Sequence, residues 1–211
     1  MKVIEQEIHS LKNSISEMWA LVHQQLYNAG EAMLTGDKEL AYKVISRERR
    51  VNAFELKIDS DCEDIIALYA PVAIDLRFVL AMYKINTNLE RLGDFAESIA
   101  RFAGNLPEGE PIDPQLVKET RVEEMLSELL SMISLTKEAF EKESSEIASR
   151  IFLKDNLIDE INHNSTAIIA KYIEEHKGSA LAGLYMAGVI RKMERFGDHC
   201  TSGRAHFLSG R

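Results

Sequence analysis

A five-residue motif, Glu-Arg-apolar-Gly-Asp, occurs at residues 90–94 and again at 194–198, an offset of 104 residues (194 − 90). Residues four apart share one face of a helix, so each copy would present two carboxylates one turn apart. Chance alone gives about five acid pairs at this spacing among the 34 acids, so the repeat is the informative part. Glycine inside a helix costs about 1 kcal/mol relative to alanine, which indicates that something approaches closely at each copy. The carboxylates are Glu90, Asp94, Glu194 and Asp198, and the glycines are Gly93 and Gly197.

Carboxylates on facing helices are typical of a cation site. A turn at Pro71 would place residues 90–94 opposite residues 49–53, where Glu48 and Asn52 are also four apart. Four oxygen-bearing side chains would then converge across one helix pair. Such hard ligands suit Fe, Mn, Mg or Ca better than a structural zinc site. We expect iron or manganese, with magnesium or zinc as alternatives.

The second copy of the motif has poorer partners. The same offset places Phe152 and Asn156 opposite the motif at 194–198, so one oxygen ligand is missing. Four other side chains, each also readable as ordinary surface, could compensate: Asp155, Asp159, His163 and His199. We therefore predict one site in the first half and a weaker or empty one in the second. The predicted ligands are Glu48, Asn52, Glu90, Asp94, Asn156, Glu194 and Asp198.

The elements that would carry these side chains are helices. Apolar residues recur at steps of three and four along most of the chain, and no window shows the alternation of a strand. Helices are expected at 4–33, 37–69, 75–103, 115–143 and 146–176, with a sixth after Gly178-Ser179. The segment 104–114 holds three of the four prolines and reads as a linker. Short connections force antiparallel neighbours, which predicts an all-α fold: a tandem pair of antiparallel, spectrin-repeat-like three-helix bundles, at 1–105 and 114–211.

Composition limits the classes of partner. The 211 residues carry 25 Lys+Arg against 34 Asp+Glu, a net charge of −9, which argues against nucleic acid or anionic membrane as direct partners. Two cysteines, Cys62 and Cys200, offer no disulfide framework and are expected to be buried. The first residues lack the apolar core of a signal peptide, and the apolar runs are too short to span a membrane. We expect a cytoplasmic protein.

With these motifs in view, the chain resembles the PhoU family of cytoplasmic regulators of bacterial phosphate uptake and phosphate-starvation signalling. The resemblance is carried by residues 75–77 (Asp-Leu-Arg) and by the motifs at 90–94 and 194–198. It implies paired E(D)xxxD motifs that bind metal clusters, although Asn52, Asn156 and Phe152 depart from the acidic pattern. It further implies a homodimer that contacts the ATPase subunit of the phosphate ABC transporter and a sensor histidine kinase. In that role the protein would keep starvation genes off when phosphate is plentiful.

Other readings remain open. A di-iron oxidase would need two Glu-x-x-His motifs, and only residues 160–163 fit, so we expect no enzyme. A helical accessory protein of a low-affinity phosphate permease would share the fold. A purely structural scaffold would use the repeated acids as ion-pair partners of Arg91 and Arg195. The basic cluster at 47–50 is either a contact for an acidic partner or a set of solvated charges.

Overall fold

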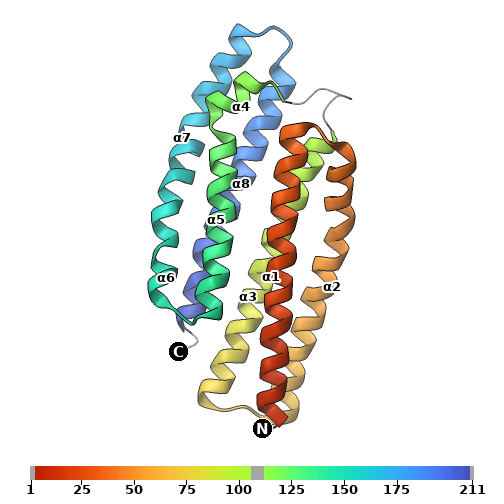
Figure 1. Ribbon diagram of the computed structural model, residues 1–211, viewed down its shortest axis with the longest axis vertical. Coiled ribbons are helices and arrows are strands. Elements are labelled where there is room, and N and C mark those ends of the chain that lie inside the picture. Colours follow the sequence, from red (N-terminus) through yellow and green to blue (C-terminus); the bar gives the residue numbers. More distant parts are fainter. Residues whose placement is uncertain (1–2, 106–111, 210–211) are drawn as a thin grey trace.

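The computed structural model describes the backbone of residues 3–105 and 112–209 and the side chains as far as Thr201. Within these ranges the only regular elements are helices. They are α1 (Val3–Thr35), α2 (Lys38–Tyr69), α3 (Ala73–Gly104), α4 (Pro114–Thr120), α5 (Val122–Glu141), α6 (Ser145–Ser149), α7 (Ile151–Glu175) and α8 (Ala180–Ser209). Helices α1 to α3 form one antiparallel bundle and α5, α7 and α8 form another (Figure 1). The predicted all-α, two-bundle fold is confirmed.

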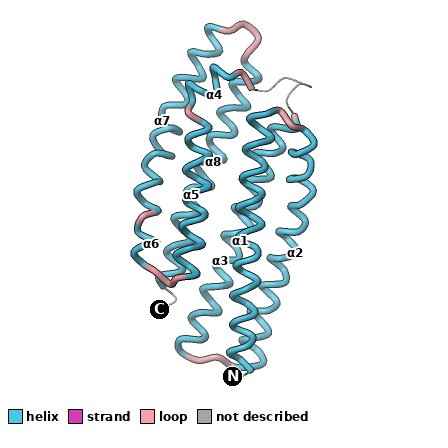
Figure 2. The backbone as a smooth tube through the Cα atoms, viewed as in Figure 1, coloured by secondary structure: helices cyan, strands magenta, loops and turns pink. Residues whose placement is uncertain are grey.

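The two bundles lie side by side. Helix α3 packs against α8 and α1 against α5, so the contact between the bundles involves two helices of each. The α2–α3 turn and the α7–α8 turn lie at opposite ends of the molecule (Figure 2). The predicted linker falls between α3 and α4, and residues 106–111 lie outside the described part of the chain. No helix among the described residues is both long and apolar enough to cross a membrane.

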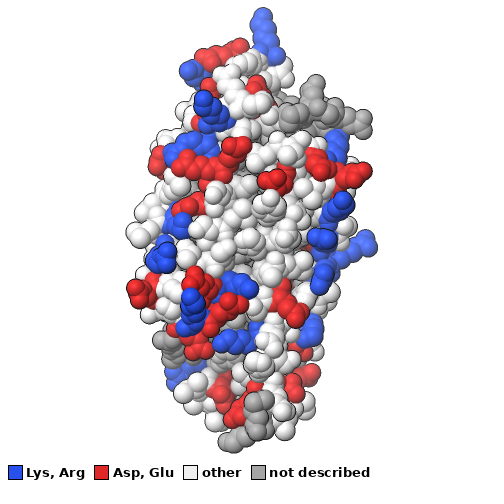
Figure 3. Space-filling model, viewed as in Figure 1, with Lys and Arg blue, Asp and Glu red and all other residues white. Residues whose placement is uncertain are grey.

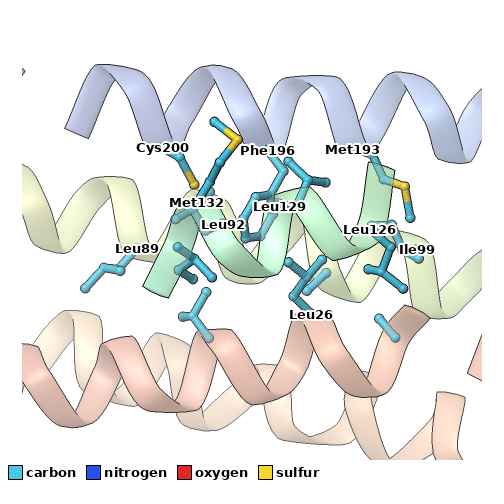
Figure 4. Close-up of a cluster of buried hydrophobic side chains, with 14 of the residues drawn as sticks. Leu26, Leu89, Leu92, Ile99, Leu126, Leu129, Met132, Met193, Phe196 and Cys200 are labelled. Atoms are coloured by element: carbon cyan, nitrogen blue, oxygen red, sulfur yellow. The ribbon is translucent and has the colours of Figure 1, made fainter. Parts of the chain in front are cut away.

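One hydrophobic core runs through both bundles. Side chains from α1, α3, α5 and α8 meet in the middle of the molecule, among them Leu26, Leu92, Leu129 and Phe196 (Figure 4). Cys62 and Cys200 are buried free thiols, as predicted. Because the core does not stop at the bundle boundary, burial of apolar surface stabilises the contact between the bundles as well as each bundle alone.

Two predicted helices are each divided in the structure, so the expected continuous helices at 115–143 and 146–176 were wrong. Arg121 adopts a left-handed backbone, with φ 57°, and separates α4 from α5. Its guanidinium bridges Glu124 at 2.7 Å and Glu160 of α7 at 2.8 Å, which stabilises the break. Arg150 interrupts the second predicted helix between α6 and α7. Neither break contains the glycine or proline that would signal it.

A buried glutamine sets the register between α1 and α2. Gln25 interrupts the apolar pattern of α1, and its side chain is fully buried. Its Nε2 donates to the Val44 carbonyl at 2.8 Å. Further along the same pair, Lys57 Nζ donates to Ser14 Oγ at 3.0 Å. These two contacts fix which α1 residues lie beside which α2 residues.

Candidate functional site

The close approach predicted at the first glycine is made by a neighbouring helix. A Cβ atom built on Gly93 of α3 would lie 2.9 Å from Val51 Cγ1 of α2, which is closer than real Cβ atoms come. Val51 is buried and, being β-branched, has little freedom to turn away. Gly93 therefore lets α2 and α3 approach to a distance at which their acidic side chains interact across the helix pair.

Those side chains form a row that we call the first carboxylate seam. Burial, followed by the charges of Asp94 and Glu55, raises the pKa of Glu90 to about 7. Burial, followed by Asp59 and Asp94, likewise raises the pKa of Glu55. The negative charges in the seam thus penalise one another. The members are Glu48, Asn52, Glu55 and Asp59 on α2 and Glu90, Asp94 and Glu97 on α3.

One end of this seam contains an amide oxygen without a hydrogen-bond partner. Burial, followed by the charge of Glu97, raises the pKa of Glu48, and the side chain of Asn52 donates a hydrogen bond to Glu48. The other atom of that amide, Asn52 Oδ1, is buried and accepts no hydrogen bond. A buried acceptor without a donor costs free energy, so it is a candidate ligand atom for a cation.

Arginine only partly offsets the negative charge of the seam. Arg91 lies 3.6 Å from Glu90 Oε2 and 3.6 Å from Asp94 Oδ2, and its side chain is 56% exposed. Long, exposed ion pairs contribute between nothing and about 1 kcal/mol. The scaffold alternative is thus partly realised, because the acids do meet Arg91. The pKa of Glu90 nevertheless stays raised beside it.

The second carboxylate seam lies between α7 and α8 and consists of Asp155, Asp159, Glu194 and Asp198. A Cβ built on Gly197 would lie 3.4 Å from Ile158 Cγ2 and 3.5 Å from Asp155 Oδ1, so the helices approach less closely here. Burial, followed by Asp159 and Asp198, raises the pKa of Asp155. Burial, followed by Asp198 and Asp159, raises that of Glu194. All four members are carboxylates.

The structure places some predicted ligands differently from the 104-residue offset. Asp155, rather than Asn156, faces α8, and Asn156 is exposed to solvent beside it. The 104-residue offset relates α3 to α8 but not α2 to α7, because the buried residues of α7 (Ile158, Ser165, Ile169 and Tyr172) lie 107 residues after those of α2 (Val51, Ile58, Cys62 and Ile65). Phe152 is also exposed. In the first seam, Glu55 rather than Glu48 is the α2 carboxylate that acts on Glu90.

Neither candidate histidine joins the acids of the second seam, although the charge of Asp198 acts on His199. His163 is exposed. His199 points toward α3, where its Nδ1 lies 3.2 Å from Asn88 Oδ1 and its ring lies 5.4 Å from that of Phe95. Burial, the largest cause, lowers its pKa. His199 therefore belongs to the contact between the bundles.

Sequence reasoning missed three members of the first seam: Glu55, Asp59 and Glu97. Glu55 and Asp59 are four apart and repeat the spacing of the α3 acids, which was a usable signal. The sequence did not show which residues of α2 lie beside which residues of α3. In the structure, buried Asn86 of α3 fixes this pairing, because it donates hydrogen bonds to both the Glu55 carbonyl and Asp59 Oδ1.

The donor atoms of both seams are of the kind that hard cations prefer. Carboxylate and amide oxygens suit Fe, Mn or Mg, and the raised pKa values show negative charge that the protein itself leaves poorly balanced. Among the described residues, no three His, Cys, Asp or Glu side chains already converge on one point. The side chains would have to turn to coordinate an ion, so coordination stays a prediction.

Comparison with known proteins gives matches over almost all of the chain. A family model described as "PhoU domain" matches twice, at residues 15–103 and 122–203. A PhoU homolog from Thermotoga maritima, named phosphate-specific transport system accessory protein PhoU homolog 1, is 31% identical over 198 residues, 94% of this chain and 84% of the relative. The accessory protein PhoU of Escherichia coli is 32% identical over 194 residues, 92% of this chain and 79% of the relative.

Solved structures agree with these matches. The crystal structure of PhoU from Pseudomonas aeruginosa superposes with a TM-score of 0.90 at 27% identity, covering 97% of this chain and 96% of that one. The phosphate transport system regulatory protein PhoU from Streptococcus pneumoniae superposes with a TM-score of 0.86, also at 27% identity, covering 97% and 95%. The likeness therefore extends over both bundles and their arrangement.

Proposed function

Because this chain belongs to the PhoU family, we propose that it is an accessory and regulatory protein of phosphate-specific transport. The observation that carries the proposal is that each half of the chain matches the PhoU domain. The fold of nearly the whole chain also superposes on a PhoU crystal structure. The relatives are named for the phosphate-specific transport system, which favours this role over that of an accessory to a low-affinity permease.

In the finer form of this proposal, the protein is a cytoplasmic adaptor. It contacts the ATPase subunit of the phosphate ABC transporter and the sensor histidine kinase, and it keeps phosphate-starvation genes off when phosphate is plentiful. It acts as a homodimer and catalyses no reaction of its own. The name of the Streptococcus pneumoniae neighbour, a regulatory protein of phosphate transport, supports the regulatory half of this role.

The carboxylate seams are proposed to hold cations, iron or manganese first and magnesium or zinc as alternatives. In the first seam the ligands would be Glu48, Asn52, Glu55, Glu90 and Asp94. In the second they would be Asp155, Asp159, Glu194 and Asp198, with Asp155 in the place predicted for Asn156. A bound cation would favour the ionised carboxylates and so offset the burial and the mutual repulsion that raise the pKa of Glu90. It would also tie α2 to α3, and α7 to α8.

Direct binding tests the adaptor role. The purified full-length protein is mixed with the transporter ATPase subunit, or with the cytoplasmic part of the sensor kinase, and the mass of any complex is measured by light scattering after size exclusion. We expect a complex with each. The ATPase subunit of an unrelated ABC transporter is the control. Failure to bind either partner, with the partners themselves folded, would contradict the adaptor role.

A further inference from the structure

A stripe of positive charge runs along the outer side of α2. Its four members are four, three and seven residues apart, which keeps them on one side of the helix over about 21 Å. We call Lys43, Arg47, Arg50 and Lys57 the cationic stripe. Lys43, Arg47 and Arg50 are exposed. Figure 3 shows blue side chains gathered along the edge of the molecule where α2 runs.

Most of the stripe has no acidic partner within the described structure. Lys57 pairs with Asp61 at 2.6 Å, but Lys43, Arg47 and Arg50 form no ion pair there. The Arg50 guanidinium lies 5.9 Å from the ring centre of Phe54, a cation–π contact that orients it without neutralising it. Three adjacent unpaired cations are unexpected in a protein of net charge −9, where acids are abundant.

The α1 surface beside the stripe carries one charged side chain, the exposed Glu17, which lies nearer to Lys57 than to Lys43. Helix α1 carries no Asp, Glu, Lys or Arg from Met18 to Gly30. The contacts of Ser14 with Lys57 and of Gln25 with Val44 place this stretch alongside the stripe. Figure 3 shows mainly uncharged surface over the middle of this face.

We propose that the cationic stripe, together with the uncharged ridge of α1, binds an acidic helical segment of a partner protein. Carboxylates at steps of four and three on a helix repeat at the same distances as the cations, so one segment can meet several of them. Arginine binds carboxylate through two parallel hydrogen bonds. Partly buried Leu21 and Phe54 lie on the facing helices and offer apolar contact to the segment. Arginine and aromatic residues are also enriched in protein interfaces.

The surroundings of the stripe favour a narrow ligand over a broad polyanion. Glu39 precedes the stripe on α2, Asp61 follows it, and the first carboxylate seam lies on the side of α2 that faces α3. Glu39 and Asp61 are each four residues from an end of the stripe, about 6 Å along the helix, which is within the roughly 8–10 Å over which charges act at physiological salt. A membrane surface or a nucleic acid would meet the acids at both ends and on both sides of the stripe, whereas a narrow acidic helix beside Lys43, Arg47 and Arg50 would approach only Glu17.

A designed peptide tests the proposal. The probe is a fluorescent amphipathic peptide of about 18 residues, about 27 Å as a helix, with glutamates at steps of four, three and seven on one face and leucines beside them. Its binding to the full-length protein is measured by anisotropy. A scrambled peptide of the same composition, phosphatidylglycerol vesicles and single-stranded DNA are measured in parallel. We expect the matched peptide to bind more tightly than all three.

Point variants locate the contact. Arg50→Glu should weaken binding of the matched peptide about tenfold or more, and a peptide in which the facing glutamate is replaced by lysine should recover much of the loss. Arg49→Glu is the matched control. It changes a neighbouring exposed arginine about 100° around the helix from Arg50 and should change binding by less than about twofold. Equal loss from both variants, no advantage of the matched peptide, or tighter binding to vesicles or DNA would overturn the proposal. The assay uses neither the transporter nor the sensor kinase, so its result is independent of the proposed function.

Discussion

The side-chain amide of Asn86 on α3 donates a hydrogen bond of 2.7 Å to Asp59 Oδ1 on α2. The same nitrogen donates to the Glu55 carbonyl at 2.9 Å, and Asn86 is completely buried. One side chain thus fixes both the orientation of a seam carboxylate and the pairing of the two helices. The remaining acids of the first seam take their positions from that pairing.

Loss of this amide should destabilise the protein. Asn86→Ala removes this donor from the partly buried Asp59 oxygen and Glu55 carbonyl, at a cost of about 1–3 kcal/mol in the free energy of unfolding. Urea denaturation of the full-length protein measures it. Asn88→Ala is the control, because Asn88 lies on the same helix but its side chain contacts His199 of α8 and not α2. An unfolding free energy of Asn86→Ala equal to that of the parent would show that the amide does not fix the helix pair.

The two repeated glycines should respond oppositely to alanine. Gly93→Ala puts a methyl group 2.9 Å from Val51 Cγ1 and should lower the free energy of unfolding by about 1–3 kcal/mol. At Gly197 the nearest atoms are 3.4 Å away, an ordinary contact, so Gly197→Ala should gain helix propensity, at most about 1 kcal/mol. Thermal unfolding of both variants tests this. Adding Val51→Ala to Gly93→Ala should restore part of the lost unfolding free energy, because it removes the methyl group that the new Cβ meets. Equal effects of the two glycine variants would contradict the difference in spacing.

Stability of the metal-free protein should depend on pH through Glu90. Its folded pKa of about 7 lies above the unfolded value of 4.5, so between these values the folded state binds more protons and stability falls as pH rises. Above pH 7 the ionised carboxylate opposes folding in full. Glu90→Gln should therefore raise the free energy of unfolding at pH 8, on the order of 1 kcal/mol after allowance for solvent screening. The gain should shrink from pH 7 to 4.5 and vanish below.

An exposed carboxylate provides the control of opposite sign for that pH series. The pKa of Glu124 is lowered, mainly because Arg121 donates a hydrogen bond to its carboxylate. Its stabilisation is therefore present above the unfolded pKa and lost as pH falls through the folded one. Glu124→Gln should destabilise at pH 8 and lose its effect in acid. Urea titrations in chelator at several pH values measure both variants, and a Glu90→Gln effect that does not change with pH would be inconsistent with a raised pKa.

Metal content should follow the carboxylates of the seams. Glu90→Gln combined with Asp94→Asn should lower the iron or manganese bound per chain, measured by mass spectrometry of purified protein. Glu194→Gln combined with Asp198→Asn tests the second seam in the same way. Arg91→Gln, which removes the competing cation, should bind metal at least as well as the parent. Equal metal content in the parent and in both double variants would remove the seams from consideration as metal sites.

Much of the fold could be predicted from the sequence because helix periodicity is local. The 104-residue repeat also identified the seam acids of α8 and, apart from Glu97, those of α3, since each motif lies within five residues. The breaks at Arg121 and Arg150 could not be read in this way. The left-handed turn at Arg121 is stabilised by Glu160, 39 residues away, and such a contact leaves no local pattern.

The other half of each seam depends on how helices pair, and there the sequence was less informative. Counting residues back from Pro71 gave the right part of α2 but favoured Glu48 and Asn52 over Glu55. The pairing depends on tertiary contacts, those of Asn86 with α2 and of Gly93 with Val51. Between α2 and α7 the repeat has an offset of 107 rather than 104 residues, so Asp155 and not Asn156 faces α8. The feature that was hardest to predict from this sequence was therefore which side chains of two paired helices lie next to each other.

The regulatory role is tested most directly by the expression of phosphate-starvation genes in phosphate-rich medium. A strain lacking the gene is compared with its parent and with a strain that carries the gene on a plasmid, using a reporter for a starvation-induced phosphatase. The account predicts high reporter activity in the deletion strain and repression in the parent and the complemented strain. Repression that remains normal without the gene would contradict it.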